Sequence, residues 1–203
     1  MKKACLLLLV IIGLYPACKK DATKSVVKVK DTVIAVNHDT SKVIFKIPDT
    51  VLSNYNKSYN SWLSYKQQCN NSYSFIMKAA YVEPSIFTII TSKVQNGVVT
   101  ARDFSAYHFI IDTVHNTATA DTTLKWHEEG NTLNTHQEAG LAMTLDDIYQ
   151  MAKSTWLNVD PSKHTFYFET KNSGLISECG SYLNGCQDNC FYGIQNISSI
   201  TSP

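Results

Sequence analysis

The chain has 203 residues, which is enough for one domain of ordinary size or for two small ones. Its formal charge of +1 and its 17% of charged residues exclude a strongly basic protein that binds nucleic acid by bulk attraction to phosphates. Its 44% apolar and 11% aromatic residues can fill a core, which argues against a disordered acidic chain. The sequence contains no apolar run of about 18 residues or more, so no lasting transmembrane helix is expected.

Residues 1–17 have the pattern of a signal peptide, with Lys2 and Lys3 at the start, an apolar run, and Ala17 before the expected cleavage point. Cys18 follows directly and resembles the lipobox cysteine of bacterial lipoproteins, which becomes the mature N-terminus and carries acyl chains. The resemblance implies a cell-envelope protein anchored to a membrane, with the outer membrane as the expected location. An ordinary secretory signal with an incidental Cys18 is the alternative. Cleavage leaves 16 basic and 17 acidic residues, a net charge near −1.

Residues 18–48 are expected to form a tether and a β-like segment, and residues 49–203 a single domain. Asp49 is predicted to cap a first helix that ends near Cys69. Strands are expected at residues 73–81, 86–94, 98–101 and 106–111, with Asn96-Gly97 as a hairpin turn because both residues tolerate a positive φ. The buried stripe of the helix follows a spacing of 3.6 residues and comprises Leu52, Tyr55, Tyr59, Trp62 and Leu63.

Residues 112–143 are Thr-rich with little periodicity, which predicts a polar insertion, a long loop with short strands at most. Thr144 and Asp147 then approximate a capping box, so Asp146-Asp147 are interpreted as caps and not as a catalytic acid/base pair. The second helix is expected to stop at Asn158–Pro161. Strands are predicted at residues 165–169, 175–179 and 191–197. This order predicts an α+β fold, an antiparallel sheet of about five to seven strands with two helices on one face.

Several of these elements resemble a family of small exported bacterial domains of unknown function. The shared features are a Trp late in the first helix, a Tyr-x-Phe strand, an Asn-Gly hairpin, a Thr-capped second helix and a terminal strand pair. The resemblance implies a fold and no activity, because the family has no known one. The matching segments are Trp62, Tyr73-Ser74-Phe75, Val94–Val98, Thr144–Tyr149 and Gly174–Ile197.

The cysteines beyond Cys18 are expected to form two disulfides, because an exported chain meets an oxidising compartment. The preferred pairs are Cys179–Cys190 and Cys69–Cys186. The competing arrangement is Cys186–Cys190 with Cys69–Cys179, and a zinc site of four thiolates is a further alternative.

No metal or other cofactor is expected. His115, His127 and His136 lack the i, i+4 spacing that places two imidazoles on one helix face, and Glu128, Glu129 and Glu138 are interpreted as parts of a solvated polar loop.

Alternating aromatic residues on the predicted strands favour a binding or interaction module for a protein, peptide or glycan. The alternatives are a hydrolase with a site assembled around His127, His136 and His164, and a purely structural protein. The aromatic residues concerned are Tyr73, Tyr81, Phe87, Tyr107, Phe109, Phe166, Tyr167 and Phe168.

Overall fold

The structure is a computed structural model that describes residues 44–81, 86–112, 115, 117–187 and 190–203. The predicted signal peptide, Cys18 and residues 18–43 of the predicted tether lie outside this part of the chain. Within the described residues, none of the helices combines the length and the apolar character needed to span a bilayer.

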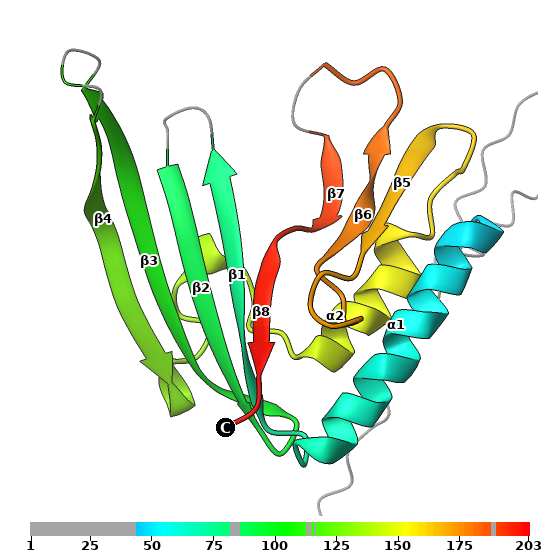
Figure 1. Cartoon of the computed structure of the whole chain (residues 1–203), viewed down its shortest axis with the longest axis horizontal. Helices are drawn as coiled ribbons and strands as arrows, with labels where there is room; N and C mark the ends of the chain where they lie inside the picture. Colours follow the sequence, from blue (N-terminus) through cyan, green and yellow to red (C-terminus); the bar gives the residue numbers. More distant parts are fainter. Residues whose placement is uncertain (1–43, 82–85, 113–114, 116, 188–189) are drawn as a thin grey trace, which may run out of the picture. The chain divides into compact units, whose positions relative to one another are not determined.

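The α+β class is confirmed, with two helices and eight strands in the part of the chain that the structure describes. The sequence pattern predicts one sheet, whereas the strands form two antiparallel sheets, of order β4-β3-β2-β1-β8 and β5-β6-β7 (Figure 1). The elements are α1 (Asp49–Gln68), β1 (Tyr73–Tyr81), β2 (Ile86–Gln95), β3 (Val98–Asp112), β4 (Thr117–Glu129), α2 (Leu145–Met151), β5 (His164–Glu169), β6 (Glu178–Leu183), β7 (Phe191–Ile194) and β8 (Ile197–Thr201).

Helix α1 covers the predicted residues, with two local differences. Asp49 is its first residue, and the N-cap is Pro48 without a side-chain cap, so the prediction that Asp49 caps the helix is wrong. Leu63 is 43% exposed although the spacing predicts it in the buried stripe, because it lies at the margin of that stripe. The helix ends where Asn70 and Asn71 adopt positive φ values of 49° and 54°, a conformation that asparagine tolerates better than most residues.

The first three strands form a meander, and the predicted hairpin joins β2 to β3. Asn96 and Gly97 have φ values of 51° and 80°, and the strands on either side of them pair antiparallel. Strand β3 is one continuous strand and not the two short ones expected. Strand β1 places Tyr73 and Phe75 on the face that meets the helices, and both are buried.

The prediction of a polar loop at residues 112–143 is wrong for its first half. Thr117–Glu129 form β4, which pairs with β3 along its length and is an edge strand of the five-stranded sheet. Most of its side chains are exposed. The sequence of this strand therefore lacks the alternation of apolar and polar residues by which a half-buried strand is recognised. Threonine nevertheless favours extended backbone. Two short 3₁₀ turns, η1 (Gly130–Thr132) and η2 (Gln137–Ala139), follow.

Helix α2 has the predicted capping box. The Thr144 hydroxyl accepts a hydrogen bond from the backbone N–H of Asp147, and the Asp147 carboxylate accepts one from the backbone N–H of Thr144. The helix continues as a π-helical turn, η3 (Ala152–Trp156), and stops before Asn158 as predicted. The Asn158 side chain accepts a hydrogen bond from the backbone N–H of Phe45 at 2.8 Å, which holds the segment before α1.

The terminal strands differ from the prediction. Strand β6 begins at Glu178, where the predicted strand nearly ends. The single strand expected at residues 191–197 is two strands, β7 and β8, that belong to different sheets. Asn196 lies between them with a φ of 54°. This left-handed residue redirects the chain from one sheet to the other.

The core lies where α2 meets α1, the inner face of β1 and β8, and the start of β6. The two helices run side by side in Figure 1. Tyr149 on α2 is completely buried, and its hydroxyl donates to the carbonyl of Ser58 on α1 and accepts from the backbone N–H of Ile176. A buried tyrosine hydroxyl requires such partners, so Tyr149 joins three segments that are far apart in the sequence.

Candidate functional site

A buried ion pair holds the segment after β4 against the sheet. Arg102 on β3 lies opposite Glu128 on β4, and both side chains are almost inaccessible to solvent. Arg102 Nε and Nη2 donate to Glu128 Oε2 at 3.0 and 2.5 Å, and Arg102 Nη1 donates to the Gly140 carbonyl at 2.8 Å. Arg102 is the only arginine in the sequence, and guanidinium suits a buried carboxylate better than the ammonium of lysine does.

The turns that follow β4 surround the Glu128 carboxylate. The backbone N–H groups of Asn134 and His136 donate to it at 3.0 and 2.7 Å. Burial disfavours the charged form, but these N–H groups and Arg102 outweigh that effect and lower the pKa of Glu128 to about 2. The carboxylate is therefore ionised at neutral pH, fully paired, and structural in its role.

Trp126 lies in the same cluster, between two other rings. Its ring stacks on Phe104 with centroids 5.0 Å apart and on His136 with centroids 4.4 Å apart. Its Nε1 donates to Glu138 Oε1 at 2.7 Å. The expectation of a solvated polar loop thus misses that Glu128, His136 and Glu138 are fixed by contacts with the sheet.

His127 points to the opposite face of β4 from Glu128, because successive residues of a strand alternate. Its Nδ1 lies 2.7 Å from Asp103 Oδ1, and its Nε2 lies 3.5 Å from Glu129 Oε2. The hydrogen bond to Asp103, followed by that to Glu129, raises the pKa of His127. Both ring nitrogens face carboxylates, so this is not the arrangement of a base beside a nucleophile.

The three histidines of the hydrolase hypothesis do not converge. His127 and His136 lie on opposite faces of the five-stranded sheet, and His164 lies on β5, where its Nδ1 is 3.0 Å from the Asp160 carbonyl. His115 occupies the turn between β3 and β4. Within the described ranges, no cluster of three or more His, Cys, Asp or Glu side chains has a geometry suited to a metal ion.

The structure contradicts the preferred disulfide pairing. Cys186 is bonded to Cys190, the competing pair, and Cys69 and Cys179 are free thiols. Cys179 pairs with Ile194 near the start of β6, and the strand continues to Leu183, so Cys179 does not lie at the mouth of the β6–β7 hairpin. Burial, with a smaller contribution from Glu178, raises the pKa of Cys179 to about 12, which makes this thiol unreactive.

Replacing Cys186 and Cys190 together by serine is expected to lower the free energy of unfolding by at most about 2 kcal/mol, because a bridge that closes so short a loop removes little denatured-state entropy. Its two cysteines are only four positions apart. Denaturant unfolding measures the loss, and peptide mapping without reductant identifies the pair. A linked Cys179–Cys190 or Cys69–Cys186 peptide would contradict this connectivity.

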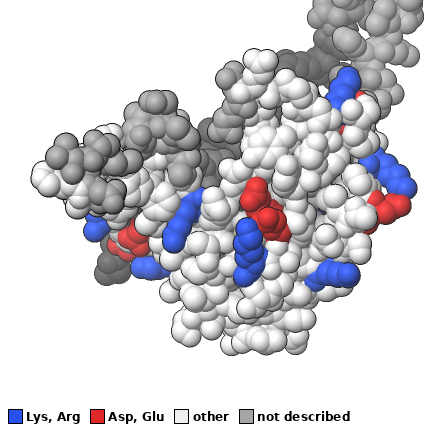
Figure 2. Space-filling model, turned by 45° about the horizontal axis from the view of Figure 1, so that its top comes forward, with Lys and Arg blue, Asp and Glu red and all other residues white. Residues whose placement is uncertain are grey.

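The outer face of the five-stranded sheet carries half-exposed aromatic side chains. Phe87 on β2 lies opposite Tyr107 on β3, and Phe109 is 6.1 Å from Phe87 between ring centroids. The inner-face residue Tyr73 is buried whereas Phe109 is 44% exposed, so at these residues the sheet has one covered face and one partly open face. In the view of Figure 2, acidic and basic side chains are few and interspersed, without a continuous field of one sign.

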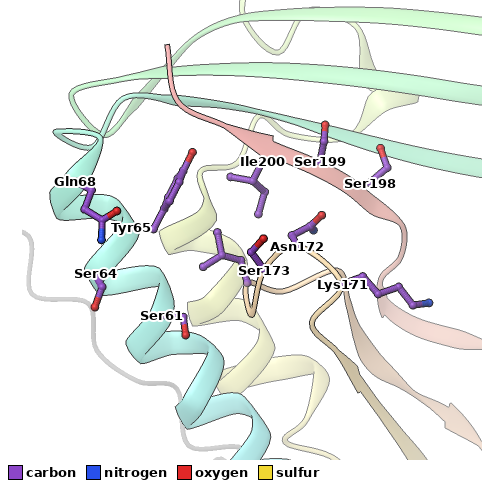
Figure 3. Close-up of a pocket in the computed structure, with 11 residues that line it drawn as sticks. Ser61, Ser64, Tyr65, Gln68, Lys171, Asn172, Ser173, Ser198, Ser199 and Ile200 are labelled. Carbon is purple, nitrogen blue, oxygen red and sulfur yellow. The ribbon is translucent and has the colours of Figure 1, made fainter.

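A groove lies between α1, the turn after β5 and β8, and we call it the α1–β8 groove (Figure 3). Its volume is about 580 Å³, within the range of about 300–1,000 Å³ that is usual for small-molecule sites. The last two turns of α1 form one wall, with Ser61, Ser64, Tyr65 and Gln68.

Residues 171–173 and 198–200 form the other walls of the α1–β8 groove, and Leu175 completes it. Ser173 and Gly174 have φ values of 53° and 89°, so they make a tight turn that reverses the chain beside α1. A Cβ atom at Gly174 would meet the Ser61 hydroxyl at 3.4 Å, which shows how closely the turn approaches the helix.

Some polar groups of the α1–β8 groove are already occupied. The Ser61 and Ser64 hydroxyls donate to carbonyls within α1, and both N–H groups of Asn172 donate to carbonyls, at 3.0 Å to Ile176 and 2.8 Å to Ile197. The side chains of Gln68 and Ser173 make no hydrogen bond within the described part of the chain.

The sequence analysis missed the α1–β8 groove, since its residues are ordinary serines, amides and apolar side chains without a motif. A second hollow of about 410 Å³ lies between α1 and α2 and includes Tyr59, Asp146 and Lys153. Its Asp146 is engaged by Trp62 and Lys66, and the Lys153 ammonium lies over the Tyr55 ring. The α1–β8 groove is the larger of these two hollows.

Comparison with known proteins finds no match for this chain among family models, curated proteins or solved structures. The resemblance to a family of small exported domains stays a prediction.

Proposed function

We propose that this protein is a lipid-anchored component of the bacterial cell envelope whose α+β unit is a binding module. The pattern of residues 1–17 followed by Cys18 supports export and anchoring. The α1–β8 groove carries the binding role, because it combines a small-molecule volume with unoccupied polar groups.

The chemistry of the α1–β8 groove favours binding over hydrolysis. None of its lining residues is a His, Asp, Glu or Cys, and the hydroxyls of Ser61 and Ser64 are directed to helix carbonyls. Among these lining residues, Lys171 carries the basic side chain. Its ion pair with Glu169 raises the pKa of the Lys171 ammonium, so that it stays protonated and does not accept a proton from a serine.

Acylation of Cys18 is expected to make it the mature N-terminus. More than one acyl chain anchors a protein stably, since each buried methylene contributes about 0.8 kcal/mol. Intact-mass measurement on the membrane fraction should show loss of residues 1–17 and gain of acyl mass. A soluble mature chain that begins at another residue would refute the anchor and leave the binding role intact.

The binding role is tested with the mature chain labelled with ¹⁵N and mixed with fractionated extracts of the cell envelope. At least one fraction is expected to shift the backbone amide NMR signals of the last turns of α1, of residues 171–175 and of β8. A binding module should do this without consuming any component of the fraction. Extracts that leave all these signals unmoved would contradict a binding module at this site. Consumption of a component of the fraction would favour the hydrolase alternative.

A further inference from the structure

The α1–β8 groove has an apolar platform. The Tyr65 ring, Leu175 and Ile200 come from three separate segments and line the same hollow, and Figure 3 shows Tyr65 on the helix wall and Ile200 on the strand wall. Tyr65 and Ile200 are each partly exposed. A ring beside aliphatic side chains offers a surface for the C–H face of a ligand.

Polar groups border this platform and have capacity left for a ligand. Gln68 offers two donors and one acceptor, and Ser173 offers a hydroxyl that both donates and accepts. Asn172 is different, because its two N–H groups hold its amide in place against Ile176 and Ile197. Its Oδ1 is consequently an acceptor whose position is set before any ligand arrives, which lowers the entropic cost of binding.

The charges around the α1–β8 groove disfavour an anionic ligand. The C-terminal turn of α1 lines the groove, and the carbonyls at a helix C-terminus carry partial negative charge. The nearby ammonium groups are neutralised, Lys171 by Glu169 and Lys66 by Asp146. A phosphate or carboxylate would therefore meet no free positive charge here.

The β8 edge is a poor template for an extended peptide. The Ile197 carbonyl already accepts from Asn172 at 2.8 Å, and the Ile197 N–H donates to the Ser177 carbonyl at 2.9 Å. Strand β8 has only five residues, and its pairing with β1 contains a register shift. Strand addition needs a row of free backbone groups, and here part of that row is occupied.

We infer that the α1–β8 groove binds a short, neutral oligosaccharide, whose C–H face lies on Tyr65, Leu175 and Ile200 and whose hydroxyls bond to Gln68, Asn172 and Ser173. Sugar hydroxyls donate and accept, as these side chains do. This inference rests on the proposed binding function and specifies its ligand class.

The test is titration of the mature ¹⁵N-labelled chain, kept in a detergent without a sugar headgroup, with maltotriose, cellotriose or chitotriose. Trigalacturonate and trialanine are the anionic and peptide probes. At about 10 mM, above the roughly millimolar Kd expected of an open site, a neutral trisaccharide should shift the signals of Tyr65–Gln68, Lys171–Leu175 and Ser198–Ile200.

Two neighbouring glutamines provide a matched pair of variants. Gln68→Ala should weaken trisaccharide binding about three- to tenfold through loss of its hydrogen bonds. Gln67→Ala should change it less than about twofold, because Gln67 is also exposed on α1 and does not line the groove. Both substitutions remove exposed side chains, so both variants are expected to fold.

The outcomes separate the ligand class from the binding role. If trialanine or trigalacturonate shifted the NMR signals of the groove residues and the neutral trisaccharides did not, the oligosaccharide inference would be overturned. The proposed binding module would still stand. Absence of groove shifts with every trisaccharide would overturn the inference as well, while the envelope extracts report independently on binding. Trisaccharide binding that Gln68→Ala does not weaken would assign the ligand to another site.

Discussion

Glu128→Ala is expected to lower the free energy of unfolding by about 3–5 kcal/mol, because removal of one partner of a buried ion pair leaves the other charge buried and uncompensated. Arg102 would lose its carboxylate partner and keep the hydrogen bond to the Gly140 carbonyl and the contact with the Trp126 ring. The backbone N–H groups of Asn134 and His136 would lose their acceptor, so the turns after β4 should detach as well. Urea unfolding followed by circular dichroism measures the loss.

Glu129→Ala is the matched control for this substitution. Glu129 is the next residue on β4, and its side chain is 74% exposed. This side chain accepts a hydrogen bond from the Thr132 backbone at the start of η1, so its loss should lower the free energy of unfolding by no more than about 1 kcal/mol. Joint replacement of Arg102 by Met and Glu128 by Leu should cost less than Glu128→Ala alone, since no unpaired charge remains. Equal losses for Glu128→Ala and Glu129→Ala would contradict the burial of the pair.

The same carboxylate makes stability depend on pH. The folded-state pKa of Glu128 is lowered from 4.5 to about 2, so below 4.5 the unfolded chain binds a proton that the folded chain does not. This contribution to stability is complete above pH 4.5 and is lost as the pH falls toward 2. Glu128→Gln should reduce the fall in the free energy of unfolding between pH 4.5 and pH 2. An unchanged fall would show that other carboxylates cause it.

Trp62→Ala is expected to lower the free energy of unfolding by about 3–5 kcal/mol, the usual cost of removing a buried aromatic side chain. Trp62 is completely buried. Its ring lies 5.0 Å from Tyr73 and 6.3 Å from Tyr149 between centroids, and its Nε1 donates to Asp146 Oδ1 at 3.0 Å. The substitution thus removes contacts that α1 makes with both β1 and α2.

Leu63→Ala supplies the comparison for Trp62. Leu63 follows Trp62 on α1 and is 43% exposed, so its truncation should cost less than about 1 kcal/mol. Thermal unfolding of both variants, with near-ultraviolet dichroism as a probe of aromatic packing, measures the difference. If Leu63→Ala lowered the free energy of unfolding as much as Trp62→Ala does, Leu63 would belong to the core, as the sequence spacing predicts and contrary to its observed exposure.

The sequence predicted those elements whose signals are short and local. The spacing of Tyr55 and Trp62, the Asn96-Gly97 turn and the Thr144–Asp147 capping box each depend on residues a few positions apart. The physical reason is that helix periodicity, left-handed φ values and capping are properties of one or two turns of backbone. The helices, the first hairpin and the α+β class follow from them.

Strand β4 and the chain's passage between sheets lacked such signals. An exposed edge strand has no apolar alternation, and its sequence therefore resembles a loop. Asn196 is a single residue in a left-handed conformation, and the neighbouring sequence does not show that it separates β7 from β8. The predicted cysteine pairing failed for a related reason, because a shift of a few residues in the bounds of β6 moved Cys179 away from the hairpin mouth.

The sequence by itself determined the composition of a compact core, the two helices, the first hairpin and the class of the fold. Only the tertiary structure decided which charges are buried and which polar groups meet. Arg102 and Glu128 are 26 positions apart, and the α1–β8 groove is built from the end of α1, the turn after β5 and the last strand. Contacts of this kind depend on strand register and sheet order, which arise from packing of the whole chain and are encoded in no short stretch of it.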